Sequence, residues 1–342
     1  MDRICAATGD ARTLRLRVLD EMREAVGFDA YAWLLTDPAT AVGTAPIADV
    51  PWLPELPDQI RLKYLSAVNR WTALAGAPVA LLHDVTGGDL SRSLVWRDLL
   101  VRYDVGDAAS VVYRDRFGCW GFLELWRLGN GRRFSHAEAA YLVETADALT
   151  RALRRCQAET FTVHPLGDPS RRVGPAVLLL SPGLTVRGQT PETAEYLRML
   201  VPTARDRAPI PASAYNVAAQ LLAVETGVDD HPPSARVHLP DGPWMTLRAA
   251  RIGVGGPADQ RDIAVTIEES SPGERVDLFA RAFGLSGRER QLLERLVAGD
   301  DTRGIAGRMF VSEHTVQDHL KSMFSKTSTH NRRTLLSRAL GS

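Results

Sequence analysis

Cysteine is scarce in this 342-residue chain, which has only Cys5, Cys119 and Cys156. The three are far apart and odd in number, which excludes a disulfide framework and any cysteine-based zinc spacing. The scarcity of cysteine predicts that the protein occupies a reducing compartment. Cys119 lies in an apolar stretch, where a cysteine usually serves as a small core residue and not as a redox sensor.

Long apolar runs are missing as well. The longest, such as residues 176–180, fall far short of the roughly 20 residues that a membrane-spanning helix needs. No apolar leader follows the first basic residue. The sequence therefore predicts a cytoplasmic protein with no membrane association.

An overall excess of charge is also absent, because 41 basic residues balance 41 acidic ones. This argues against a protein that coats nucleic acid along its whole surface. The balance is local, however: in residues 285–340 Lys and Arg outnumber Asp and Glu by ten to six. Overall neutrality therefore conceals one mildly basic segment on a mildly acidic body.

Catalytic motifs are the last absence. The chain has no phosphate-binding P-loop, no Gly-x-Ser-x-Gly elbow and no His-Glu-x-x-His zinc helix. His83 and His136 have no second ligand at a useful spacing, so we predict no metal or haem site. We expect no enzymatic activity and no cofactor.

The C-terminal part carries a series of short amphipathic helices. Ser286 precedes Glu289 at the spacing of a capping box, which predicts the start of a helix that Gly299 ends. A second helix is expected over 302–309 with Asp301 as its N-cap, and Ser312 is placed to cap a third. The turn between the second and third helices falls at Phe310-Val311.

The third helix has two distinct faces when it is projected at about 100° per residue. Val316, Leu320, Met323 and Phe324 fall on one face, and the other carries a polar set. That polar set consists of His314, Gln317, Asp318, Lys321 and Ser325. A helix held by its apolar face, with such a set exposed, fits the major groove of DNA.

Residues 285–340 resemble the LuxR/NarL-type helix-turn-helix domain. The matching residues, in register, are Leu285, Ser286, Arg288, Glu289, Gly299, Ile305, Ala306, Ser312, Thr315, Val316, His319, Lys326 and Arg332. Two departures are Gly304 and Gly307, each expected to cost about 1 kcal/mol of helix propensity. A third is Ser328, which stands where the family has a turn glycine.

The resemblance implies roles for individual side chains. Base edges would be contacted by Gln317, Asp318 and Lys321. Phosphates would be contacted by Arg303, Ser312, Thr315 and Lys326. Hydrogen-bonding chemistry supports the roles of the three residues at base edges. Lys donates to guanine and Gln brackets adenine, whereas a carboxylate accepts from cytosine or orients a neighbouring cation.

The N-terminal half alternates helices with an antiparallel hairpin. A helix is expected over 13–26 and a strand over 29–35, followed by a proline-rich loop from Pro46 to Pro57 and a helix through Ile60. Strands over 108–113 and 119–128 form the hairpin, and Ser135 with Glu138 caps a long closing helix. Residues 10–157 resemble a GAF domain in this order and in the hairpin sequence.

A second pattern follows a breaker-rich connection at 164–169. A hairpin around Ser181-Pro182-Gly183, two helices, and three strands with a turn at Pro240-Asp241-Gly242 give an order that resembles a PAS domain across residues 160–270. Residues 271–282 are assigned to a linker, and 283–342 to the DNA-binding domain. The predicted fold class is α+β sensory domains with antiparallel sheets, followed by an all-α four-helix domain.

GAF and PAS folds form a half-open cavity over their sheet, which suits a small molecule. The tryptophans that could line such a pocket in the first unit are Trp33, Trp71, Trp96, Trp120 and Trp126. Aromatic residues at these spacings are more often plain core. Both interpretations are kept open, and no effector is identified.

The predicted function is a transcriptional regulator that binds double-stranded DNA as a homodimer, with a small molecule or a partner controlling the binding. RNA polymerase is a candidate partner. One alternative is a signalling scaffold whose helix-turn-helix is vestigial. Another is a nucleotide-cycling enzyme with a DNA-binding tail, which the absent catalytic motifs disfavour.

Overall fold

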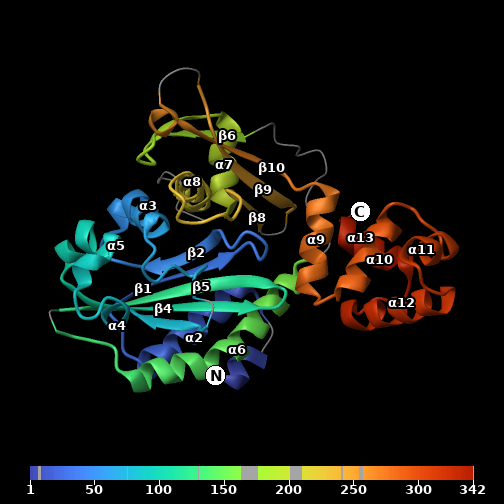
Figure 1. Ribbon diagram of the computed structural model, residues 1–342, viewed down its shortest axis with the longest axis horizontal. Helices are drawn as coiled ribbons and strands as arrows, with labels where there is room; N and C mark the ends of the chain where they lie inside the picture. Colours follow the sequence, from blue (N-terminus) through green and yellow to red (C-terminus); the bar gives the residue numbers. More distant parts are fainter. Residues whose placement is uncertain are drawn as a thin grey trace.

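The computed structural model describes residues 1–6, 9–74, 76–129, 131–162, 176–200, 210–239, 242–253 and 257–341. Figure 1 shows two β-sheet units, one above the other, with a helical head at their side. Each sheet has five antiparallel strands, and four helices form the head. This confirms the predicted fold class. The connection predicted at 164–169 and the turn residues Pro240 and Asp241 lie outside the described residues.

The first sheet has the strand order β2-β1-β5-β4-β3. Its strands are β1 (Ala30–Thr36), β2 (Gly43–Asp49), β3 (Val79–Leu81), β4 (Val105–Asp115) and β5 (Gly118–Leu128). Its helices are α1 (Asp2–Ala6), α2 (Ala11–Ala25), α3 (Leu56–Leu65), α4 (Leu82–Val85), α5 (Leu94–Asp98) and α6 (His136–Glu159), with 3-10 turns η1 (Leu53–Glu55), η2 (Leu90–Arg92) and η3 (Leu100–Tyr103). Helices α2 and α6 cover one face, and α3 and α5 lie at the other (Figure 1).

The strand β2 corrects the proline-rich loop that the sequence predicts around Pro46. This segment pairs with β1 at the edge of the sheet, with Trp33 opposite Ile47 and Leu35 opposite Thr44. The register shifts between these pairs, so Pro46 lies at an irregularity of an edge strand. An edge strand or a bulge is where a sheet tolerates a residue without a backbone N–H.

The second sheet repeats the strand order of the first as β7-β6-β10-β9-β8. Its strands are β6 (Ala176–Leu180), β7 (Val186–Gln189), β8 (Ser234–His238), β9 (Trp244–Arg251) and β10 (Ile263–Glu269), and a 3-10 turn, η4, covers Ala258–Gln260. Two helices, α7 (Pro191–Leu200) and α8 (Ala212–Glu225), separate the second strand of the set from the third. The five strands and both helices follow one another in the order that the sequence predicts.

Helix α8 joins the two units. It is rich in alanine and is buried along nearly its whole length, including the polar Asn216 and Gln220. Figure 1 shows it between the two sheets, and it packs against β9 of its own unit and against α3 and β2 of the first. A helix buried on every side needs partners on every side, so the two sheet units share one apolar core.

A buried ion pair fixes one side of this joint. Arg70 of the first unit is 2% exposed and donates to the Asp229 carboxylate at 2.7 Å and to Gln220 of α8 at 2.9 Å. Asp229 also accepts from the Thr72 hydroxyl at 2.7 Å. Burial acts to raise the pKa of Asp229, but hydrogen bonds from His231, Thr72 and Arg70 lower it below its usual range.

The segment that the sequence assigns to a linker is helix α9 (Pro272–Ala282). Ser271 and Glu274 form a capping box at its start, and Phe279 is fully buried. Phe279 packs edge-on against Phe161, which follows α6, and Phe161 stacks on Trp244 of β9. The connection to the head is therefore a rigid helix held by both sheet units.

Candidate functional site

The head contains α10 (Gly287–Val297), α11 (Thr302–Met309), α12 (Glu313–Thr327) and α13 (Arg332–Leu340). The predicted caps form: Ser286 and Glu289 make the capping box of α10, Asp301 caps α11, and Ser312 caps α12. Phe310, in the predicted turn, adopts a left-handed conformation with φ of 57° and ends α11.

Helix α12 is anchored as its periodicity predicts. Val316, Leu320 and Met323 are at most 1% exposed and pack into the head core, and Phe324 is half-buried beside them. Helix α12 packs mainly against α10 and α11. Figure 1 shows it along the outer edge of the head.

The opposite face of α12 is exposed and charged. Gln317, Asp318 and Lys321 are all exposed, and the Lys321 side chain retains 75% of its accessible surface. The Asp318 carboxylate lies 3.6 Å from the Lys321 ammonium and 3.5 Å from the His314 ring. Asp318 therefore lies between the Lys321 ammonium and the His314 ring, in a position to orient Lys321.

Glu289 ties the first helix of the head to α12. Its carboxylate accepts from the Ser322 hydroxyl at 2.6 Å and from the Lys326 ammonium at 2.7 Å. Burial acts to raise the pKa of Glu289, but hydrogen bonds from Lys326, Ser322 and Ser286 lower it to about 2. The capping residue of α10 thus also positions α12.

The four residues expected at phosphates are placed in different ways. Arg303 is exposed on α11, and Ser312 and Thr315 lie at the N-terminus of α12, where backbone N–H groups favour an anion. The Thr315 backbone N–H donates to the Ser312 hydroxyl at 3.1 Å. Lys326 differs, because its ammonium is paired with the buried Glu289 carboxylate, although the lysine side chain itself is exposed.

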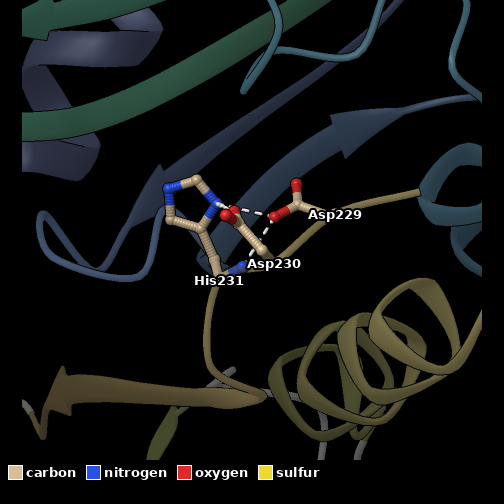
Figure 2. Close-up of side chains that lie close together, drawn as sticks. All are labelled: Asp229, Asp230 and His231. Carbon is tan, nitrogen blue, oxygen red and sulfur yellow. Dashed lines mark hydrogen bonds and ion pairs between the residues drawn. The ribbon is translucent and has the colours of Figure 1, made fainter. Parts of the chain in front are cut away.

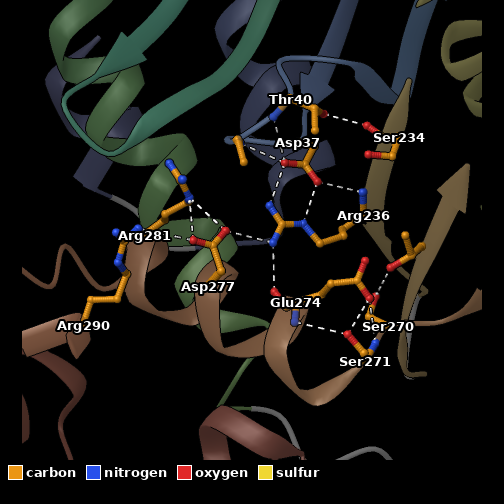
Figure 3. A network of polar contacts seen from close by, with 12 residues as sticks. Asp37, Thr40, Ser234, Arg236, Ser270, Ser271, Glu274, Asp277, Arg281 and Arg290 are labelled. Carbon is orange, nitrogen blue, oxygen red and sulfur yellow. Dashed lines mark hydrogen bonds and ion pairs between the residues drawn. The ribbon is translucent and has the colours of Figure 1, made fainter. Parts of the chain in front are cut away.

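A polar network connects the head to both sheet units (Figure 3). Arg236 of β8 binds both oxygens of Asp37, in the β1–β2 loop, at 2.7 and 2.8 Å. It also donates to Asp277 of α9 at 3.0 Å, and Asp277 accepts from Arg281 at 3.0 Å. Arg290 of α10 lies 3.6 Å from the same Asp277 carboxylate.

The Arg236–Asp37 pair is almost completely removed from water. Asp37 is 1% exposed and Arg236 is 8% exposed. Burial acts to raise the pKa of Asp37, but the hydrogen bonds and positive charge of Arg236 lower it below its usual range. One arginine therefore links the first sheet, the second sheet and the helix that carries the head.

A cavity of about 290 Å³ lies where the first sheet meets α3 and α8. Its floor includes Phe122, Glu124 and Trp126, which are alternate residues of β5 and therefore share a face. Gln59 and Lys63 of α3 line one wall, and Ala212 and Asn216 of α8 line another. Most of the remaining lining is aliphatic, which suits a small organic molecule.

The five tryptophans that the sequence places at one pocket do not line a common pocket. Trp126 lines the cavity, whereas Trp33 and Trp120 lie on the opposite face of the sheet under α2 and α6. Trp120 changes face because the β4–β5 register shifts after Tyr113. Trp71 stacks on Phe122 with centroids 4.2 Å apart, and Trp96 lines a separate depression beside His83.

Asp229, Asp230 and His231 form the one cluster of possible metal ligands within the described ranges (Figure 2). Asp229 lies within 2.6 Å of the His231 ring, and its carboxylate is also the acceptor for Arg70 and Thr72. These contacts already use the lone pairs of Asp229. The cluster acts as part of the joint between the two sheet units.

Sequence reasoning missed the polar residues of the cavity. Glu124 could have been noticed, because it is the single acidic residue in an apolar strand, residues 118–128. Gln59 and Asn216 carry no comparable signal. They reach the cavity through the packing of α3 and α8 from separate units.

Comparison with known proteins identifies the head. A family model described as bacterial regulatory proteins, luxR family, matches residues 284–339. The chain therefore carries a luxR-type helix-turn-helix domain at its C-terminal end. The description of that family names regulatory proteins. A search of curated proteins finds no match to the chain.

Solved structures give distant likenesses. The chain is similar to Escherichia coli SdiA, with 13% identity over 98% of this chain and 93% of that one and a TM-score of 0.35. A bacteriophytochrome from R. palustris, RpBphP3, has 16% identity over 78% of this chain and 60% of its own, with a TM-score of 0.31. Vibrio cholerae VqmA, a dimer, has 18% identity over 50% and 84%, with a TM-score of 0.19.

No helix in the described part of the chain has the length and apolar character to cross a bilayer.

Proposed function

We propose that the protein is a sequence-specific transcriptional regulator that acts in the cytoplasm and binds double-stranded DNA through α12. The observation that carries this proposal is a luxR-type head whose α12 is anchored by Val316 and Leu320 and exposes Gln317, Asp318 and Lys321. Lys321 would donate to guanine, Gln317 would bracket adenine, and Asp318 would orient Lys321 or accept from cytosine. Arg303, Ser312 and Thr315 would contact phosphates.

We further propose that the two sheet units are the sensory part. Residues 10–157 would form a GAF-like unit and 160–270 a PAS-like unit, with 271–282 connecting them to the DNA-binding domain at 283–342. The shared strand order of the sheets and the cavity between α3 and α8 support this assignment. The Asp37–Arg236–Asp277 contacts offer a route from the sheets to the head.

The active form would be a homodimer, because one head contacts few base pairs and two heads match paired half-sites. Helix α13 is a candidate contact, although it also packs against α9. Dimerisation through α13 would use the side that α9 and the head core leave open, which carries the exposed Arg333. RNA polymerase remains a candidate partner of the bound dimer.

DNA binding itself is tested by measuring affinity for duplex DNA across a salt series. We expect the logarithm of the binding constant to fall linearly with the logarithm of salt, since phosphate contacts release counterions. Arg303→Ala should make the slope shallower by about one unit. A flat response in the unmodified protein would favour a scaffold that does not use the head for DNA.

A further inference from the structure

Phe310, in the turn between α11 and α12, is the most exposed large apolar side chain in the described part of the chain. It retains 93% of its accessible surface, whereas the other exposed side chains of this kind retain 37–46%. Figure 1 shows α11 on the side of the head that is farthest from both sheet units. No described part of the protein therefore covers this ring.

The backbone of Phe310 is unusual as well. Its φ of 57° and ψ of 46° lie in the left-handed region, where a Cβ is strained and glycine or asparagine is the usual residue. The turn holds this conformation, because the Val311 N–H donates to the Ala306 carbonyl at 3.0 Å and Met309 is 2% exposed. A lone exposed apolar residue needs no explanation, but an exposed ring on a strained backbone points to a contact outside the folded chain.

The ring lies next to the end of α12 where the proposed function places phosphates. Phe310 precedes the N-cap, Ser312, by two residues, so their Cα atoms lie within about 7 Å of each other. The backbone N–H groups at that end favour an anion, and Arg303 of α11 is exposed. These neighbours suit a nucleic acid better than the apolar surface of a protein. A duplex that brings its phosphates to these groups also brings its major groove close to Phe310.

The chemistry of the ring limits what it can contact in that groove. Hydrogen-bond donors and acceptors occupy most of the base edges there, and the 5-methyl of thymine is the apolar group among them. A phenyl ring has no N–H or O–H to donate and no lone pair to accept with, so it gains little from the polar edges of the other bases. Packing the methyl group on the ring removes apolar surface of both from water.

We propose that Phe310 packs on the 5-methyl group of a thymine at one edge of the site that α12 occupies, and thereby selects thymine at that position. This inference rests on the proposed binding of duplex DNA. It adds an apolar contact to the polar contacts of Gln317 and Lys321, at a base pair beyond theirs. The contact involves no charge, so it differs in its salt dependence from the phosphate contact of Arg303.

The test uses the duplex that the full-length protein selects from random DNA, with deoxyuridine replacing each thymine in turn. Deoxyuridine pairs with adenine as thymine does but lacks the 5-methyl group. At one edge position the replacement should weaken binding of the unmodified protein about fourfold, as expected for one buried methyl group. The same replacement should leave the affinity of Phe310→Gly unchanged, because the ring that contacts the methyl group is gone.

The choice of variants separates the ring from the fold of the turn. Glycine adopts the left-handed conformation without strain, so the melting temperature of Phe310→Gly should be no lower than that of the unmodified protein. Phe310→Asn also tolerates this conformation and should respond to deoxyuridine as Phe310→Gly does, which excludes an effect of a more flexible turn. Ile252→Ala, an exposed apolar change after β9, is the matched control and should keep the fourfold response. The slope of log affinity against log salt should be the same in all four proteins.

Equal sensitivity to deoxyuridine in the unmodified protein and in Phe310→Gly would overturn the inference, and so would a selected motif with no thymine at its edge. Unchanged DNA binding by Phe310→Gly, together with loss of transcription by RNA polymerase, would assign the ring to a protein partner and overturn it too. In each of these cases a motif that depends on Lys321 would still support the proposed regulator. The absence of any selected motif would contradict both.

Discussion

Gly304 and Gly307 both lie within α11, yet they differ in what surrounds them. A Cβ at Gly307 would meet nothing within 4 Å, whereas one at Gly304 would lie 3.1 Å from the Asp301 carboxylate that caps the helix. Neither glycine has a positive φ, so alanine suits the backbone at both positions. The two positions therefore differ in whether an added methyl group would contact the Asp301 cap.

Gly307→Ala should raise the free energy of unfolding of the head by about 0.5–1 kcal/mol, because alanine reduces the entropy of the unfolded chain and has the higher helix propensity. Gly304→Ala should gain less, since its methyl group crowds the Asp301 cap. Hydrogen exchange of the α11 amides measures both variants. A larger gain at position 304 than at 307 would contradict the geometry described for the cap.

Glu289 makes the head sensitive to acid. Its pKa is about 2 in the folded chain against an ordinary 4.5. Because the folded value is the lower one, the carboxylate contributes stability above about pH 4.5, and this contribution is lost as the pH falls towards 2. The loss follows protonation of the group that Lys326 and Ser322 hold.

We therefore expect the difference in stability between the unmodified protein and Glu289→Gln to be largest near pH 6 and to shrink by pH 3. Hydrogen exchange of the α10 and α12 amides at several pH values reports it. Other acid-sensitive groups affect both proteins alike and cancel in the difference. A difference that does not change with pH would show that the Glu289 charge has no stabilising role.

Helix α9 shows how strongly local patterns determine an element and how little they reveal about its neighbours. Its capping box at Ser271 and Glu274 is the same kind of motif that predicts α6 and α10 correctly. The sequence does not reveal the partner of its apolar face, because Phe279 packs on Phe161, which is far away in the sequence. Local capping could be predicted from the sequence, whereas contacts between units could not.

Arg236→Met tests the connection between the sheets and α9. Removing the guanidinium leaves Asp37 buried and unpaired, which should lower the free energy of unfolding by about 3–5 kcal/mol. Arg132→Met is the control, because Arg132 is an exposed partner of Asp29 in the first unit and should cost about 1 kcal/mol or less. Denaturant titration measures both. Equal effects of the two substitutions would show that the buried network does not hold the units together.

The molecule as a whole depends on contacts that no single stretch of sequence encodes. Most of the elements along the chain and the four helices of the head were predictable, because alternation, caps and turn residues act over short distances. The cavity was not predictable, because Gln59 and Asn216 line it from two different units, and Trp120 leaves the expected face through a register shift. Helix α8 explains why the cavity could not be predicted, because this one buried helix packs against both sheet units.

The central claim is that the exposed face of α12 determines which DNA sequence the protein binds. The most direct measurement selects bound sequences from a pool of random duplex DNA, using the full chain, Gln317→Ala and Lys321→Ala. Arg187→Ala, an exposed change on β7 of the second sheet, is the matched control. We predict that the full chain and the control select the same motif, while each α12 variant relaxes it at one or two base pairs, worth about 1–3 kcal/mol each. The same motif selected by all four proteins would contradict the claim.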